Sequence, residues 1–401
     1  MSVKKILNQV IGLVLIISIL VPGLSAAEKK AKNIIFMVPD GMGLADITAV
    51  RIYKYGIGKG RLFIEKLEHV GYQSNFAANS IVTDSAAAAS AWACGQKFNN
   101  GEISCHGESG EFPPTILELA KAQGKTAGLV ATSTITHATP AAFGAHVKSR
   151  RGETEIAQQY IQKTNVDVIL GGGKKMFSPS NNAEGEPAVD LIAEAKARGY
   201  TFVESRDKLL KVQNPQKLLG LFNDEALTPV YKKAADVSIN RINSKEPSLS
   251  EMTQVALKVL EKNEEGFFLL VEGSQVDWGN HQHNIDYMFW ELLEFDNAVG
   301  VVLDWIQAQP DRKDETLLIV VPDHETGGFA INGPYGSTFT EPGQKITDGW
   351  TTENHTGVDT IIWSQGPYSQ YLGKAIDNTD VFHIMKAALL GEGAPRRGEP
   401  K

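Results

Sequence analysis

The sequence has little cysteine: Cys94 and Cys105 are the only two among 401 residues. Two thiols can form at most one disulfide, so the chain is not a small scaffold built on disulfide bonds. The two could pair in an oxidising compartment, a question that the sequence leaves open.

An excess of positive charge is also missing. The chain has 39 Lys and Arg against 47 Asp and Glu, which gives a formal net charge of −8. Binding along a nucleic acid requires basic residues that neutralise phosphates, so nucleic-acid binding is excluded as the main role. A local group of cationic side chains could still bind one small anion.

Long hydrophobic runs are absent after residue 21. The one such run, Ile11 to Val21, follows Lys4 and Lys5 and precedes Pro22 and small residues that end at Ala27. This order is typical of a secretory signal peptide, here residues 1–26, since a membrane anchor needs about 20 apolar residues. We therefore expect a protein exported to a periplasm or secreted, with no membrane span after cleavage.

What is present is a globular composition, with 42% hydrophobic and 21% charged residues, which excludes a wholly disordered chain. Short apolar runs that suit strands buried on both faces alternate with helical patterns at 115–123 and 252–263. This alternation predicts an α/β three-layer sandwich with a mostly parallel central sheet flanked by helices. The predicted strands are Ile34–Val38, Ala127–Ala131, Val166–Leu170, Phe267–Val271, Leu317–Val321 and Thr360–Trp363.

Two tracts interrupt this alternation within what we expect to be a single catalytic domain, residues 27–401. The pattern weakens over 174–250, which we interpret as an inserted, peripheral segment. Residues 327–357 are rich in Gly, Thr and Pro and form a long tract without a clear helix or strand pattern. Long loops in compact domains are commonly functional, so we expect this tract to fold over a site.

Acidic residues and a histidine stand where three of the predicted strands end. Open α/β sheets bind ligands at the carboxyl ends of their strands, so these side chains should meet at one edge. Each one alone could be a helix cap or a turn residue. Together they form the carboxylate and imidazole set that binds zinc, with carboxylate-rich positions that suit magnesium. The residues are Asp40, Glu272, Asp277, Asp323 and His324.

Asp277 and His281 have the i, i+4 spacing that brings two side chains to one point on a helix. His283 is a rival ligand, although on a helix it would point elsewhere. His355 stands shortly before the last predicted strand and is a weak signal when taken alone.

Ser85 is the candidate nucleophile. An alanine-rich segment follows it, so Ser85 stands near a helix N-terminus, where an anion is favoured. The alternative is that Ser85 only caps this helix. Arg150 could hold two oxygens of a tetrahedral oxyanion, and its alternative is a solvated basic patch on the surface.

Six motifs, in order, resemble the alkaline phosphatase family and cover residues 40 to 357, nearly the whole of the chain after residue 26. They are Asp40-Gly41-Met42-Gly43, Thr83-Asp84-Ser85-Ala86-Ala87, His137-Ala138-Thr139-Pro140, Glu272-Gly273 with Asp277 and His281, Asp323-His324-Glu325-Thr326-Gly327-Gly328, and His355-Thr356-Gly357.

The resemblance implies hydrolysis of small phosphate monoesters at alkaline pH through a phosphoserine on Ser85, with Arg150 on the non-bridging oxygens. Water at the zinc that Asp277, His281 and His355 would bind would hydrolyse the phosphoserine. The inorganic phosphate released would act as a product inhibitor. The family also implies a homodimer. The implied ligands are Asp277, His281 and His355 for one zinc, Asp40, Asp323 and His324 for a second zinc, and Asp40, Thr139 and Glu272 for magnesium.

Two positions depart from the best-known bacterial pattern. His137 stands in place of an aspartate beside the magnesium, so we expect weak magnesium retention or a third zinc. Trp278 stands in place of a lysine near the phosphate, so we expect weaker inhibition by inorganic phosphate.

Other classes of protein fit the sequence less well. A sulfatase of the same superfamily needs Cys or Ser in a C/S-x-P-x-R context, which neither cysteine has. Phosphodiesterase activity stays open as a side reaction, because the metal core is shared. An exported metal- or phosphate-binding protein without catalysis would not need Ser85.

Overall fold

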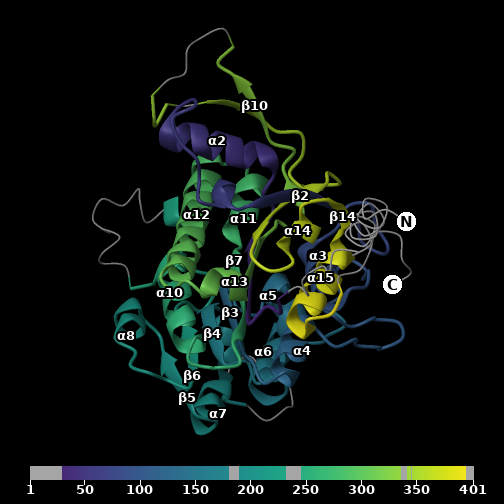
Figure 1. Cartoon of the computed structure of the whole chain (residues 1–401), viewed down its shortest axis with the longest axis vertical. Coiled ribbons are helices and arrows are strands. Elements are labelled where there is room, and N and C mark those ends of the chain that lie inside the picture. Colours follow the sequence, from purple (N-terminus) through teal and green to yellow (C-terminus); the bar gives the residue numbers. More distant parts are fainter. Residues whose placement is uncertain (1–28, 180–188, 232–244, 336–340, 345, 394–401) are drawn as a thin grey trace, which may run out of the picture.

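A ten-stranded sheet runs through the molecule between two layers of helices (Figure 1). The structure is a computed structural model that describes residues 29–179, 189–231, 245–335, 341–344 and 346–393. The predicted signal peptide, residues 1–26, lies outside these ranges, and the division between it and the catalytic domain stays a prediction. Among the described residues, no helix combines the length and the apolar character that a membrane span requires.

The sheet is mostly parallel: among the strands that the structure describes, only β13 runs antiparallel to its neighbours, β2 and β8. This confirms the predicted α/β architecture. In spatial order the strands are β14 (Ala375–Asp377), β2 (His69–Ser74), β13 (Thr360–Gln365), β8 (Thr316–Val320), β1 (Asn33–Pro39), β7 (Phe267–Gly273), β3 (Thr126–Thr134), β4 (Val168–Gly172), β6 (Lys217–Leu221) and β5 (Tyr200–Val203).

Residues of β1 alternate between two hydrophobic cores, one on each face of the sheet. Phe36 packs in the first core with α3 (Ser85–Cys94), α4 (Ile116–Ala122), α5 (Ala138–Gly144), α6 (Glu153–Gln162) and α15 (Asn378–Leu390). Ile35 and Met37 pack in the second, with α2 (Leu44–Tyr55), α10 (Leu249–Leu260) and α12 (Ile285–Gln307). Burial on both faces explains why the sequence of such a strand reads as a continuous apolar run. Shorter helices are η1 (Ile64–Lys66), α11 (Gln275–His281), α13 (Arg312–Glu315) and α14 (Ser369–Leu372).

The segment 174–250 extends the same sheet at one edge. It contributes η2 (Lys174–Phe177), α7 (Leu191–Ala197), β5, α8 (Arg206–Leu210) and β6, and β6 pairs with β4 in parallel. The Arg206 guanidinium forms an ion pair with Glu251 of α10, which ties the segment to the second helix layer. The described part of this segment is therefore peripheral in place but continuous with the central sheet.

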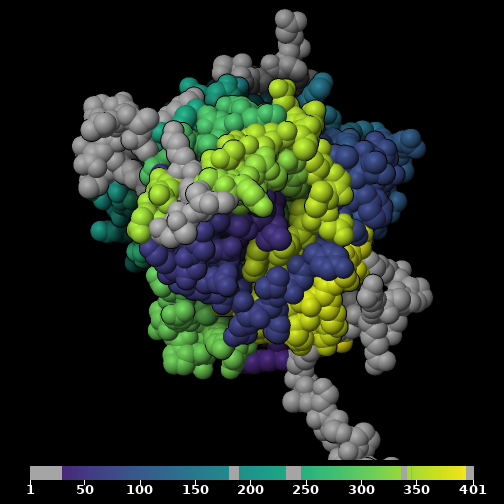
Figure 2. Space-filling view, turned by 90° about the horizontal axis from the view of Figure 1, so that it is seen from above, coloured from purple at the N-terminus to yellow at the C-terminus, as the bar shows by residue number. Residues whose placement is uncertain are grey.

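The described part of the tract 327–357 contributes to two small antiparallel ribbons. One joins β10 (Ala330–Gly333) to β11 (Thr347–Gly349), and the other joins β9 (Glu325–Thr326) to β12 (His355–Thr356). The tract, coloured yellow-green, lies beside α2 at one end of the molecule (Figures 1 and 2). The second ribbon carries His355 from this tract back toward the strand ends.

Cys94 and Cys105 are buried and carry free thiols in this structure. Burial raises the pKa of the Cys94 thiol to about 12, so this group is uncharged at physiological pH. The two cysteines therefore contribute as small buried side chains.

Candidate active site

The carboxyl ends of β1, β7 and β8 meet because β1 pairs with β7 on one side and with β8 on the other. Asp40 directly follows β1, and Glu272 is the penultimate residue of β7. The chain turns sharply at Gly41, where φ is +73°, and a Cβ atom there would lie 2.6 Å from the Asp277 carboxylate. Only glycine fits this close approach, so the turn after Asp40 depends on it.

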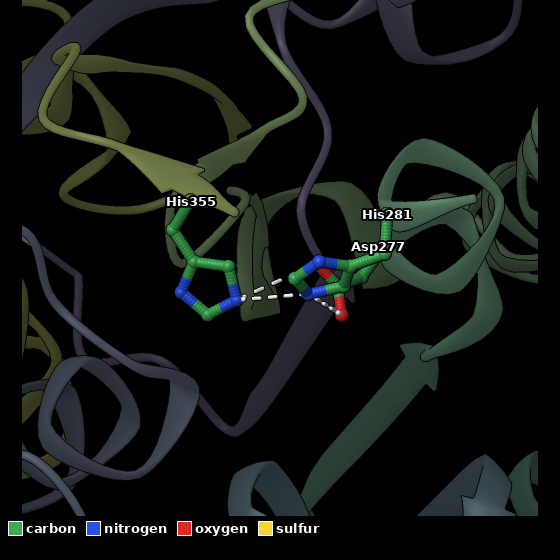
Figure 3. Close-up of side chains that lie close together, drawn as sticks. All are labelled: Asp277, His281 and His355. Carbon is green, nitrogen blue, oxygen red and sulfur yellow. Dashed lines mark hydrogen bonds and ion pairs between the residues drawn. The ribbon is translucent and has the colours of Figure 1, made fainter. Parts of the chain in front are cut away.

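Acidic and histidine side chains form three groups, in each of which one ligand atom per residue lies within 4.8 Å of the others. The first group is Asp277, His281 and His355 (Figure 3). The Nε2 atoms of the two histidines are 3.2 Å apart, and His281 Nε2 lies 3.3 Å from Asp277 Oδ2. These two ring nitrogens and the carboxylate converge from a helix and from the β12 ribbon, as the ligands of one cation would.

The second group, Asp40, Asp323 and His324, is completely buried. His324 Nε2 lies 3.1 Å from Asp323 Oδ2 and 3.6 Å from Asp40 Oδ1. The backbone N–H of Gly41 donates to the other oxygen of Asp323, at 3.1 Å. The two groups adjoin, because the imidazoles of His324 and His355 are stacked.

The third group is Asp40, His137 and Glu272, so Asp40 is common to the second and third groups. The hydroxyl of Thr139 is buried and has no hydrogen-bond partner in the structure. His137, which the resemblance implies is beside a third cation, lies in this group with two carboxylates.

Several polar atoms of these groups are buried without a hydrogen bond, and these unsatisfied atoms test whether cations would fit. Such atoms are costly to bury unless a partner satisfies them. Burial and the nearby charges of Asp323, Asp277 and Glu272 hold the pKa of Asp40 well above its usual range. Carboxylate oxygen and imidazole nitrogen are the donors that zinc prefers, so the donor sets fit divalent cations. The unpartnered atoms are both Oδ atoms of Asp40, Asp323 Oδ2, Glu272 Oε1, Thr139 Oγ1 and His137 Nδ1.

Ser85 is the first residue of α3, and its Oγ lies 3.2 Å from His324 Nε2. The side chain that caps the helix is Asp84, whose Oδ1 accepts from the N–H of Ala87 at 2.9 Å. The alternative that Ser85 serves as the cap is therefore wrong. Its hydroxyl instead stands at the positive end of a helix, beside the second group of ligands.

Arg150 reaches into the site from the turn before α6. Its Nη1 donates to Asp84 Oδ2 at 3.0 Å, and its Nη2 lies 3.1 Å from His137 Nε2. The side chain is 26% exposed, so a surface patch in bulk solvent does not describe it.

His137 and Trp278 are in contact, with ring centroids 6.2 Å apart in an edge-to-face arrangement. Burial, together with the nearby Arg150 guanidinium, lowers the pKa of His137 to about 4. His137 is therefore a neutral imidazole near pH 7, the form that binds metal ions.

His283, the rival ligand, belongs to none of the three groups found among the described residues. Its ring stacks on Trp350 instead. Two further residues belong to the site although the sequence pattern did not single them out: Thr326, whose hydroxyl donates to Asp277 at 2.5 Å, and Asp84, which accepts from Arg150. Asp84 lies next to the candidate nucleophile, and a charged residue at that position is a signal that could have been followed.

The chain matches the family model described as alkaline phosphatase over residues 31–345. Alkaline phosphatase 3 of Bacillus subtilis is 34% identical, with 92% of each chain covered. Alkaline phosphatase of Escherichia coli is also 34% identical, over 91% of this chain and 87% of that one.

Solved structures agree with these relatives. The alkaline phosphatase of the Antarctic bacterium TAB5 is 29% identical and superposes with a TM-score of 0.76, covering 90% of this chain and 99% of that one. A TAB5 variant with one histidine replaced by aspartate has magnesium bound in the site called M3. The chain belongs to the alkaline phosphatase family, whose members are phosphoric monoester hydrolases.

Proposed function

We propose that this chain hydrolyses phosphate monoesters at alkaline pH through a covalent phosphoserine on Ser85. The products are an alcohol and inorganic phosphate. The observation that carries the proposal is the position of the Ser85 hydroxyl, 3.2 Å from His324 Nε2 at the N-terminus of α3. A cation-binding protein without catalysis would not need a nucleophile at that point.

Three cations would occupy the three groups. When bound, they supply positive charge that activates oxygen nucleophiles and stabilises the attacking and leaving oxygens. The residues that would hold them are Asp277, His281 and His355 for one zinc, Asp40, Asp323 and His324 for a second zinc, and Asp40, Thr139 and Glu272 for magnesium, or for a third zinc with His137.

The chain's own groups account for the two displacements. Ser85 Oγ attacks phosphorus in line with the leaving alcohol, whose bond to phosphorus breaks as the bond to Ser85 forms. The proton of the Ser85 hydroxyl passes to solvent, and the departing alcohol oxygen takes one up. Water then attacks the phosphorus of the phosphoserine, the bond between phosphorus and Ser85 Oγ breaks, the serine oxygen regains a proton, and inorganic phosphate is released. The N-terminus of α3 favours the anion, and the two Nη atoms of Arg150 donate to the non-bridging oxygens. Asp84 orients the guanidinium for this task through its 3.0 Å hydrogen bond.

The third cation is where this chain is expected to differ from the best-known bacterial pattern. His137 adds an imidazole to Asp40 and Glu272, and nitrogen is a better donor for zinc than for magnesium. Two TAB5 variants, in which one histidine is replaced by aspartate or by glutamate, have magnesium bound in M3, which supports a carboxylate as a partner for magnesium.

Location and assembly are also proposals. The basic, apolar and small-residue order of residues 1–26 supports export to the periplasm or beyond the cell. The homodimer is an expectation taken from the family.

The decisive test is hydrolysis of a chromogenic aryl phosphate at alkaline pH by the wild type and by Ser85→Ala, before and after chelation. We expect turnover to fall at least about a thousandfold in Ser85→Ala, as for other nucleophiles, and after chelation. Ser90→Ala is a matched control, since Ser90 lies on the same helix and its hydroxyl donates to the Glu102 carbonyl and accepts from the Ser104 N–H, away from the three ligand groups. Chelator-sensitive turnover that survives in Ser85→Ala would show that water attacks phosphorus directly.

A further inference from the structure

His283 lies two residues beyond the end of α11, with a backbone φ of +48°. This left-handed conformation is uncommon for residues other than glycine, although asparagine, aspartate and histidine adopt it more often than the rest, and it persists where the surroundings hold it. A histidine there, outside the three ligand groups of the described residues, therefore calls for a reason.

The reason is found in the contacts of its ring. The imidazole of His283 stacks on the indole of Trp350, with centroids 5.0 Å apart and planes inclined by 13°. Its Nε2 donates to the carbonyl oxygen of Thr352 at 2.7 Å. Phe329 packs against the same indole at 4.6 Å, and a Cβ atom on Gly327 would lie only 2.6 Å from it. Trp350, which is partly exposed, thus packs among His283, Phe329 and Gly327.

The next carbonyl along the chain is held in the same way. His281 Nδ1 donates to the carbonyl oxygen of Glu353 at 2.5 Å, which turns its Nε2 toward His355. His281 and His283 therefore donate to the carbonyl oxygens of two consecutive residues, Glu353 and Thr352. We name the segment 350–356, which contains both carbonyls, the strap. The Gly327 N–H donates to the Asn354 carbonyl at 3.0 Å on the opposite edge of the strap.

We propose that His283 and Trp350 are positioning residues that hold the strap against α11. They thereby keep the His355 imidazole close to Asp277 and His281. The identity of the ion that these three residues hold rests on the proposed function. His355 reaches the site on the strap, whereas Asp277 and His281 reach it on α11 (Figure 3). A ligand set drawn from two separate elements binds tightly only if the elements are held together before the ion arrives.

The test compares zinc affinity, measured by competition with a chelator, in the wild type, His283→Asn and His283→Phe. Asparagine tolerates the left-handed backbone but is too short to stack or to reach the strap. Phenylalanine keeps the stack and loses the donor. Supporting partners of metal ligands typically contribute 10–100-fold in affinity, so we expect zinc to bind about tenfold more weakly to His283→Asn and by a smaller factor to His283→Phe.

Two controls separate positioning from other effects. His106 also stacks on an aromatic ring, Phe98, with centroids 4.4 Å apart, but it lies in none of the ligand groups, so His106→Ala should keep the wild-type zinc affinity. Cobalt-loaded His283→Asn should keep the wild-type absorption maxima, because its ligands are unchanged, whereas His281→Ala should shift them.

Wild-type zinc affinity in His283→Asn would overturn the proposal, and so would a cobalt spectrum like that of His281→Ala, which would make His283 a ligand. Neither result touches the proposed function. Failure of the wild type to bind zinc or to hydrolyse phosphate monoesters would overturn the proposed function instead.

Discussion

Arg150 donates from Nη1 to Asp84 Oδ2 over 3.0 Å, and the other oxygen of the same carboxylate caps α3. One side chain therefore fixes both the guanidinium that would hold phosphate oxygens and the first turn of the helix that begins with Ser85. This double use makes the two functions of Asp84 separable by mutation.

Asp84→Ala should lower the free energy of unfolding by about 1 kcal/mol, the usual contribution of an N-cap. It should also raise KM for an aryl phosphate by roughly tenfold, because Arg150 loses a charge-assisted hydrogen bond. Asp84→Asn should keep the cap and raise KM alone. Denaturant unfolding and steady-state kinetics measure the two effects.

Asp190→Ala is the control for the cap, since Asp190 caps α7 in the same way and lies far along the chain from this site. It should lower stability without changing KM. An unchanged KM in Asp84→Asn would mean that Arg150 is held in place without Asp84.

His137→Asp should make the third cation site retain magnesium. A carboxylate replaces a neutral imidazole beside Asp40 and Glu272, and magnesium prefers oxygen ligands and added negative charge. After dialysis in magnesium and zinc, metal analysis should find more magnesium per chain in His137→Asp than in the wild type. His137→Asn supplies an oxygen ligand without a charge, so its magnesium content should lie between those of the wild type and His137→Asp. Equal magnesium in all three proteins would show that residue 137 does not determine which ion is bound.

The strand ends were predictable because their chemistry is local. Asp40, Glu272 and Asp323 each stand at the end of an apolar run, and parallel strands deliver such ends to one edge. The direction of β13 was not predictable, since an apolar run such as Thr360–Trp363 reads alike in parallel and antiparallel pairs. Nor was the extension of the sheet by β6, where the run Lys217–Leu221 is short and lies in a segment of weak pattern.

Contacts between residues far apart in the chain could not be predicted from the sequence for another reason. Arg150 and Asp84 are 66 positions apart, and nothing in either local pattern indicates the other. The stack of His283 on Trp350 likewise depends on how the tract 327–357 folds back over α11. Periodicity predicts which face of an element is buried, but not which two loops meet.

Trp278→Lys should strengthen inhibition by inorganic phosphate. Trp278 contacts His137, and His137 contacts Arg150, so residue 278 borders the place where phosphate would bind. A lysine there would add one charge-assisted hydrogen bond, and we expect an inhibition constant roughly tenfold lower. Trp278→Gln removes the indole without adding charge and should leave the constant near that of the wild type. Equal inhibition of Trp278→Lys and Trp278→Gln would show that residue 278 does not reach the product.

The partly buried pair His146 and Glu118 should give stability a pH dependence that is separate from the cation site. Burial opposes the charge on His146, but hydrogen bonds to the Glu118 carboxylate and the Ser104 carbonyl outweigh it and raise the pKa of His146 above 6.5. Burial likewise disfavours the Glu118 carboxylate, but the hydrogen bonds from His146 and Thr115 lower its pKa below 4.5.

The direction of this pH dependence follows from which protonation form of each group the folded state stabilises. A raised histidine pKa stabilises the fold fully below pH 6.5, and this contribution is lost as pH rises through the folded value. Glu118, whose pKa is lowered, contributes stability that is fully present above pH 4.5 and is lost as pH falls through its folded pKa. The difference in unfolding free energy between wild type and His146→Gln should therefore be largest between pH 4.5 and 6.5 and should shrink toward pH 8. Glu118→Gln should show the same profile, since either change breaks the pair, and a difference from wild type that stays constant with pH would show that the pair is not charged in the fold.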